Sequence, residues 1–165
     1  MVKTVFTLAL AASALALAAP AGAKMIDNWD VATNAKSCTM VSTFADDVTV
    51  GLIWSKTGEL GFITTLPRPN GVRGRATAPV QLTFDGDSPM TQWEDDRAAV
   101  VSGPDNDALI ANWGAAHSDE LARAVKAASH VKLRVGGKDV GTYDLSGSPA
   151  AYRALSHCGE QLAAK

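Results

Sequence analysis

Two serines and three histidines are the residues of this chain that could support covalent catalysis. Ser118 stands between His117 and Asp119, but the members of a Ser–His–Asp triad normally meet through the fold, not as sequence neighbours. Ser146 lies in the segment DLSGS, which lacks the glycine that a nucleophile elbow places two residues before its serine. The sequence therefore predicts a protein without a catalytic site. The alternative is a small secreted hydrolase that uses Ser146 or Ser118 with a histidine.

Metal ligands are also sparse. The three histidines are at positions 117, 130 and 157, so no two of them are close enough in sequence to bind one metal from the same helix. Two acidic turns, DGD at 85–87 and DND at 105–107, lack the further oxygen ligands and the terminal glutamate of an EF-hand calcium loop. We therefore expect no metal and no other cofactor.

Cys38 and Cys158 are the two cysteines of the chain. Redox sites usually hold their cysteines close together, as in C-x-x-C, so a structural disulfide is a simpler interpretation than a redox pair or two free thiols. Closing a loop of about 120 residues would stabilise the fold by roughly 4–5 kcal/mol on the chain-entropy model. A disulfide in turn predicts an oxidising compartment.

The N-terminal 23 residues have the features of a secretory signal peptide. A basic Lys3 precedes an apolar run from Val5 to Leu17, and an A-x-A sequence ends at Ala23. The run is too short for a membrane span, which needs about 20 apolar residues. We expect residues 1–23 to be removed, leaving a single globular domain, residues 24–165, that is periplasmic or secreted and has no membrane span.

The charge of this domain limits its partners. Removing residues 1–23, whose one charged residue is Lys3, turns 15 basic and 17 acidic residues into 14 and 17, a net charge of −3. Mild acidity argues against binding to nucleic acid or to an anionic membrane surface. An envelope or host protein remains as a partner, and the sequence does not predict the oligomeric state.

A loop rich in proline, glycine and arginine interrupts the strand pattern. Residues 67–79, PRPNGVRGRATAP, contain Arg68, Arg73 and Arg75, and loops of this composition are normally exposed. Trp93 precedes three acidic residues, which suggests an edge position. We predict that these arginines and Trp93 form the contact surface of the protein, if it has one. A solvated loop and a half-buried tryptophan are the simpler alternatives.

Alternation of apolar and polar residues predicts antiparallel strands through much of the chain. The clearest hairpin has the arms Val48–Trp54 and Leu60–Leu66, and a second, 131–143, turns at two adjacent glycines. Gly51 and Gly61 inside the first hairpin predict a bulge or the close approach of another backbone. Further strands are predicted at Trp29–Val31, Cys38–Phe44, Val80–Phe84 and Ala98–Val101.

Helices are expected in the C-terminal half. Residues 105–115 place three large apolar residues on one side of a helix, and a second helix begins near Ser118. A third begins at Ser148-Pro149, with a serine cap and a proline in the first turn. Its apolar stripe includes Cys158, so the sulfur should face the sheet.

The predicted fold class is therefore α+β. It consists mainly of an antiparallel β-sheet or sandwich, with two or three helices in the C-terminal half. The last helix is docked on the sheet by a disulfide between Cys38 and Cys158.

Several short motifs follow one another along the chain in an order that is seen in a known family. W-x-V at Trp29–Val31 is followed by a strand with Cys38, by the hairpin arm VTVGLIW, and by DLSGSPAAYRAL after the late hairpin. This order resembles the invasion-associated locus B family of exported alphaproteobacterial proteins, although Gly147-Ser148 replaces the usual glycine–aromatic pair and the additional cysteines of some relatives are missing. The resemblance implies a periplasmic or secreted, β-rich, non-enzymatic protein, linked in some relatives to the cell envelope or to host-cell invasion.

The expected function is that of an exported, non-catalytic binding or envelope-associated protein. An inhibitor of an envelope enzyme is a further alternative, beside the small hydrolase.

Overall fold

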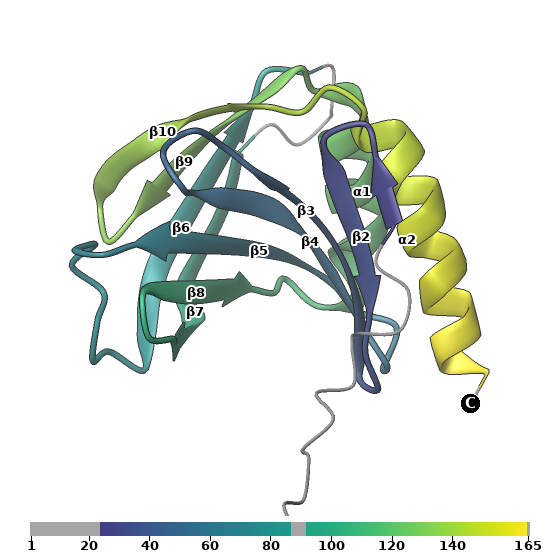
Figure 1. The fold of residues 1–165 in the computed structure, drawn as a ribbon, viewed down its shortest axis with the longest axis horizontal. Coiled ribbons are helices and arrows are strands. Elements are labelled where there is room, and N and C mark those ends of the chain that lie inside the picture. Colours follow the sequence, from purple (N-terminus) through teal and green to yellow (C-terminus); the bar gives the residue numbers. More distant parts are fainter. Residues whose placement is uncertain (1–23, 87–91, 165) are drawn as a thin grey trace, which may run out of the picture.

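The computed structural model describes residues 24–86 and 92–164 (Figure 1). Their strands form one ten-stranded antiparallel sheet in the order β1-β2-β3-β4-β5-β8-β7-β6-β9-β10. Two α-helices follow in the C-terminal half of this described part, so the predicted α+β class is confirmed. The predicted signal peptide, residues 1–23, lies outside the described residues.

The elements have the following bounds. The strands are β1 (Lys24–Ile26), β2 (Trp29–Thr33), β3 (Ser37–Thr43), β4 (Thr49–Ser55), β5 (Leu60–Pro67), β6 (Thr77–Phe84), β7 (Gln92–Ser102), β8 (Asn106–Ala111), β9 (His130–Val135) and β10 (Lys138–Asp144). The helices are the short 3₁₀ turn η1 (Ala115–His117), α1 (Ser118–Ala127) and α2 (Ser148–Ala163).

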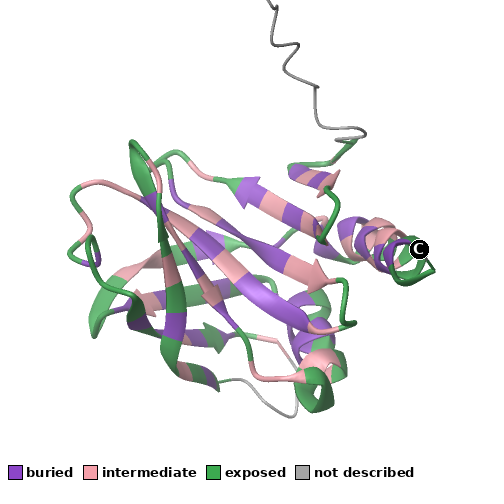
Figure 2. Cartoon of the chain, turned by 90° about the horizontal axis from the view of Figure 1, so that it is seen from below, coloured by how far each residue is buried: buried purple, intermediate pink, exposed green. Residues whose placement is uncertain are grey.

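The period-2 pattern determines which side chains enter the core. In β3, the buried side chains of Cys38, Met40 and Ser42 alternate with more exposed neighbours, and the same alternation marks most strands in Figure 2. The sheet is curved, and its inward side chains pack against the two helices and against one another. Trp29 and Trp93 are the largest of the fully buried side chains.

The two glycines of the first hairpin are required by close packing. A Cβ at Gly51 would lie 2.0 Å from the carbonyl oxygen of Met40, and one at Gly61 would lie 2.8 Å from that of Ala111. Both distances are too short for a real side chain, so the close approach predicted for these positions is confirmed.

The helices cover one end of the sheet. Helix α2 packs on β2, β3 and β4, while α1 packs on β5 and on α2 (Figure 1). The Cys38–Cys158 disulfide, with a Cα–Cα distance of 6.1 Å, joins α2 to β3, as predicted. Because Ala151, Leu155 and Leu162 are buried, the apolar stripe of α2 also faces the sheet as predicted.

The predicted serine cap of α2 is wrong. Neither α1 nor α2 has a side-chain cap, and the N-cap residues are His117 and Gly147. The Ser118 hydroxyl instead accepts a hydrogen bond from the backbone N–H of Leu60, and the buried Ser148 hydroxyl donates one to the carbonyl of Val125. Each serine thus fixes its helix to a neighbouring element.

The predicted helix over residues 105–115 is also wrong. Residues 106–111 of this segment form β8, in which Asp107, Leu109 and Ala111 are buried and alternate with more exposed residues. The adjacent Leu109 and Ile110 fit one side of a helix or opposite faces of a strand, and pairing with β5 and β7 decides for the strand.

Candidate functional site

Three connections come together at the side of the sheet away from the helices (left in Figure 1), and a cleft lies among them. The turn between β3 and β4, the loop after β5 and the β9–β10 hairpin surround a pocket of about 310 Å³. The cleft is lined by Asp46, Val48, Leu66, Pro67, Pro69, Asn70, Val135, Lys138, Asp139 and Val140. Its lining combines apolar side chains with polar ones, the composition typical of a binding site.

The floor of the cleft is rigid and apolar. Val48, Leu66 and Val135 come from three different strands or strand ends, and each is at most 5% exposed. They belong to the main core, so an apolar group that enters the cleft would meet the edge of that core. Such contact removes apolar surface from water and favours binding.

One wall is the loop that follows β5, and a buried ion pair holds it. Arg68 Nη2 lies 2.9 Å from Oδ1 of Asp107, whose side chain is 0% exposed. The guanidinium also donates to the carbonyl oxygens of Gly103 and Pro104. The Arg68 hydrogen bond holds the pKa of the Asp107 carboxyl well below its usual value, so this carboxyl is ionised.

Asn70 extends this network into the cleft. Its amide nitrogen donates to Asp107 Oδ2 at 3.0 Å and to the carbonyl of Leu66, while its side-chain oxygen accepts the backbone N–H of Val72. The peptide bond between Arg68 and Pro69 is cis. The wall therefore has one defined conformation, set by buried hydrogen bonds.

The opposite wall is the start of β10, and its charged contacts are exposed. Asp139 lies 3.1 Å from Lys132 Nζ and 2.8 Å from Arg134 Nε, although the arginine contact lacks hydrogen-bond geometry and is mainly Coulombic. The Lys132 hydrogen bond lowers the pKa of Asp139. A ladder irregularity between Asp139 and Gly141 brings Val140 to the cleft.

A hydrogen bond joins the β3–β4 turn to β10 beside the cleft. The Tyr143 hydroxyl donates to Asp46 Oδ2 at 3.0 Å, and the Tyr143 ring packs on Phe44 with centroids 4.8 Å apart. Burial and the nearby Asp46 carboxylate raise the pKa of Tyr143, which therefore remains a neutral donor. This bond couples two segments that are 97 residues apart.

The structure separates the residues that we predicted as a contact surface. Trp93 is 0% exposed and packs edge-on against Trp113, so the predicted edge position is wrong. Arg68 serves the buried network, so it cannot serve as a free surface cation. Arg73 and Arg75 are exposed, in the loop that forms the first wall of the cleft.

The predicted nucleophiles hold local structure. Ser146 Oγ donates to Asp144 Oδ1 at 2.7 Å, and its carbonyl accepts the indole N–H of Trp29. The hydroxyl of Ser118 bonds to the backbone of β5. The histidine side chains bond elsewhere, His130 to Asp85 at 2.9 Å and His157 to Gln161 at 3.0 Å.

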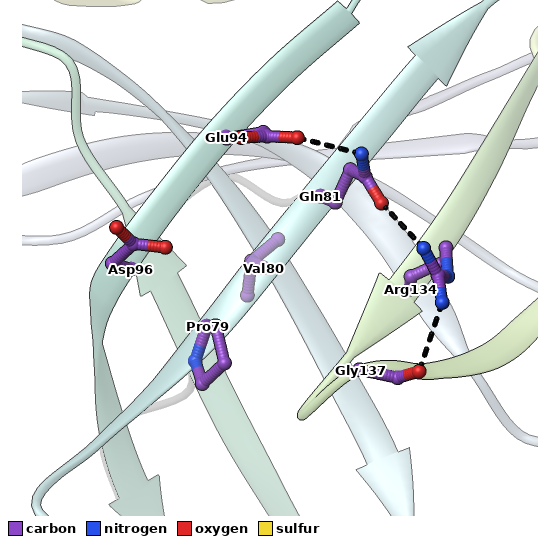
Figure 3. Close-up of a pocket in the computed structure, with 7 residues that line it drawn as sticks. All are labelled: Pro79, Val80, Gln81, Glu94, Asp96, Arg134 and Gly137. Atoms are coloured by element: carbon purple, nitrogen blue, oxygen red, sulfur yellow. Dashed lines mark hydrogen bonds between the residues drawn. The ribbon is translucent and has the colours of Figure 1, made fainter.

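A second depression, of about 170 Å³, lies on the outer face of β6, β7 and β9 (Figure 3). A ladder of side chains crosses it: Arg134 donates to Gln81, which donates to Glu94 at 2.7 Å. Because these polar groups already bind one another, they offer less to a ligand than the cleft does.

Sequence reasoning missed the polar residues of the cleft. Asp107 was hidden by the wrong helix at 105–115, although its alternation with Leu109 and Ala111 is the signal that reveals an inward-facing acid. Asp46 and Val140 carry no recognisable motif, since the fold alone brings them together. Within residues 24–86 and 92–164, no cluster of three potential metal ligands occurs.

The structure is that of a disulfide-linked antiparallel β-sheet protein with a small, partly apolar cleft. Comparisons with protein-family models, with curated proteins and with solved structures found no match to the chain. The resemblance to the invasion-associated locus B family therefore stays a prediction from sequence motifs.

Proposed function

We propose that this chain is an exported, non-catalytic binding protein that takes an apolar side chain of a partner protein into the cleft. The observation that carries the proposal is the meeting of three distant segments around an apolar floor with polar groups at its rim. The volume of about 310 Å³ suits one or two side chains of a partner more than an extended ligand.

A charge at the rim of the cleft adds to this proposal. Lys138 lines the second wall. An acidic group beside the apolar anchor of the partner would meet this cation, which favours docking in one orientation. An envelope or host protein is the class of partner that fits the family resemblance.

The proposed location is the periplasm or the exterior of the cell. A disulfide that closes a loop of 120 residues is consistent with an extracytoplasmic protein. Within the described part of the chain, no helix is long and apolar enough to cross a membrane. The signal-like residues 1–23 support export.

Photo-crosslinking in the native cell tests the proposal. A photoreactive amino acid replaces Val140 in the cleft or, as the control, the exposed Lys56 in the β4–β5 turn at the other end of the strands. We expect a covalent adduct with another protein from position 140 and none from position 56. Adding Val48→Asp, which places a charge on the apolar floor, should remove the adduct.

Two outcomes would contradict the cleft as the binding site. One is the absence of any adduct from position 140 above the level at position 56. The other is an adduct that persists unchanged after Val48→Asp, with the variant still folded by circular dichroism.

A further inference from the structure

The outer face of the sheet has two halves of opposite character. On β6 and β9, the outward positions include Gln81, Lys132 and Arg134. Arg134 donates to Gln81 (Figure 3), and Lys132 and Arg134 both contact Asp139. On β3, β4, β5, β8 and the second half of β7, the outward positions carry no charge. We name this second half the uncharged face.

Strand register defines the uncharged face. One row across the sheet consists of Val41, Gly51, Ile63, Ile110 and Ala99, each opposite the next in the ladder. The neighbouring row consists of Thr43, Thr49, Thr65, Ala108 and Val101. The positions in β3, β5 and β8 alternate with buried residues of the same strands, and the ladder places the β4 and β7 positions beside them, so both rows point away from the core.

Neighbouring side chains cover the two glycines of β4 and β5. Cγ1 of Val41 lies over Gly51, and Cγ2 of Ile53 lies over Gly61, so neither glycine leaves a hole. The hydroxyls of Thr49 and Thr65 bond to each other at 2.6 Å, which reduces their need for water. A one-sided antiparallel sheet normally alternates apolar-inward with polar-outward residues, and the row with Val41, Ile63 and Ile110 departs from that rule.

Exposed apolar side chains border the face. In the described residues, Met25 and Val101 are the two large apolar side chains that are exposed, by 67% and 56%. At one margin, Met25 of β1 pairs with Asp30 of β2, and Asp30 pairs with Val41 of β3. Val101 lies in β7 at the other margin. Exposed apolar side chains beside an uncharged face favour an interaction site there.

We propose that the uncharged face is the interface of a homodimer, packed sheet on sheet against a second copy of this chain. The margins favour a second copy because they are complementary: Asp27 and Asp30 lie at the β1–β2 margin, and Arg73 and Arg75 lie in the loop that leads into Thr77 at the β6–β7 margin. A two-fold axis parallel to the strands places each acidic margin opposite a basic one.

The size of the face fits a weak dimer. Two rows across five strands about 4.8 Å apart, with a shorter third row of Thr39, Ile53 and Gly61, cover roughly 400 Å². Two copies would therefore bury roughly 800 Å², which is in the range of weak, transient contacts. We expect a dissociation constant in the micromolar range.

Sedimentation equilibrium of the protein expressed from the full chain tests the dimer. We expect a monomer–dimer equilibrium that Ile63→Lys weakens about tenfold or more, because it places an unpaired charge in the interface. Val101→Lys, at a margin that is already exposed, should act in the same direction without affecting folding. The matched control is Thr83→Lys, an exposed outward position on the charged half of the sheet, which should leave the equilibrium unchanged.

A protein that stays monomeric up to roughly 1 mM would overturn the proposal, since a specific contact of this size is populated at that concentration. A dimer that both lysine variants leave intact, with thermal unfolding of each variant unchanged, would also overturn it by locating the contact elsewhere.

Discussion

The two walls of the cleft each contain an arginine–aspartate ion pair, and the pairs differ in burial. In the loop wall, the side chains of Arg68 and Asp107 are 18% and 0% exposed. In the hairpin wall, those of Arg134 and Asp139 are 43% and 60% exposed. Removing one partner of a buried pair leaves a charge without solvent, whereas the partner of an exposed pair regains water.

The difference has a consequence for binding. The loop wall is one conformation enforced by a buried network, so it supplies a fixed surface for a ligand. The hairpin wall depends on exposed charges and on the Tyr143–Asp46 hydrogen bond. Adjustment to a ligand should therefore occur in the hairpin.

Breaking the buried pair should produce the largest effect. Arg68→Met leaves the Asp107 carboxylate in the interior with only part of its hydrogen bonds, so we expect the thermal midpoint to fall on the order of 10 °C. Adding Asp107→Asn removes the unpaired charge and should recover part of this loss. Differential scanning calorimetry measures both variants.

The matched control for that experiment is Arg73→Met, an exposed arginine of the same loop. It should change the midpoint by no more than about 3 °C. Equal losses for Arg68→Met and Arg73→Met would show that the buried pair does not stabilise the loop wall.

The second largest effect is expected in acid, where the ion pair of the loop wall should lose its contribution to folding stability. The pKa of Asp107 is lower in the folded protein than in the unfolded chain, where it has its ordinary value of 3.8. Near pH 3.8 the unfolded chain therefore binds more protons than the folded protein does. The stabilisation is therefore complete above the unfolded pKa and is lost as the pH falls through the folded one. Between pH 5 and pH 2, urea unfolding should show a loss of stability that is smaller in Arg68→Met/Asp107→Asn.

Asp139, whose pKa is lowered less strongly, should contribute less to this loss. Asp139→Asn should therefore keep nearly the pH dependence of the unmodified protein. If stability falls with pH in the Arg68→Met/Asp107→Asn variant as steeply as in the unmodified protein, the acid sensitivity comes from other carboxylates. Asp85 and Asp144 also have a lowered pKa.

The hairpin wall was predictable from sequence and the loop wall was not. Alternation around Gly136-Gly137 identifies β9 and β10, because a local pattern and a local turn encode a hairpin. The Cys38–Cys158 disulfide follows from there being two cysteines. In contrast, Arg68 and Asp107 are 39 residues apart and meet through the pairing of β5 with β8, which no local pattern encodes.

The same reason explains the error at Trp93. Its acidic neighbours indicated an edge position, but β7 lies between β6 and β8 and buries Trp93 and Ala98, while the residues between them stay at least partly exposed. The burial of a side chain depends on which strands flank its own, and that order is a property of the whole sheet.

The smallest effect is expected in the hairpin wall. Asp139→Asn removes exposed contacts with Lys132 and Arg134, which water replaces, so the thermal midpoint should fall by no more than about 3 °C. Because exposed charges are screened by salt, this difference should disappear near 1 M salt, where the Debye length is about 3 Å. The loss caused by Arg68→Met should persist at that salt concentration, since solvent ions do not reach Asp107. A salt-independent Asp139→Asn effect, or an Arg68→Met effect that salt removes, would mean that the two walls are held by the same kind of interaction.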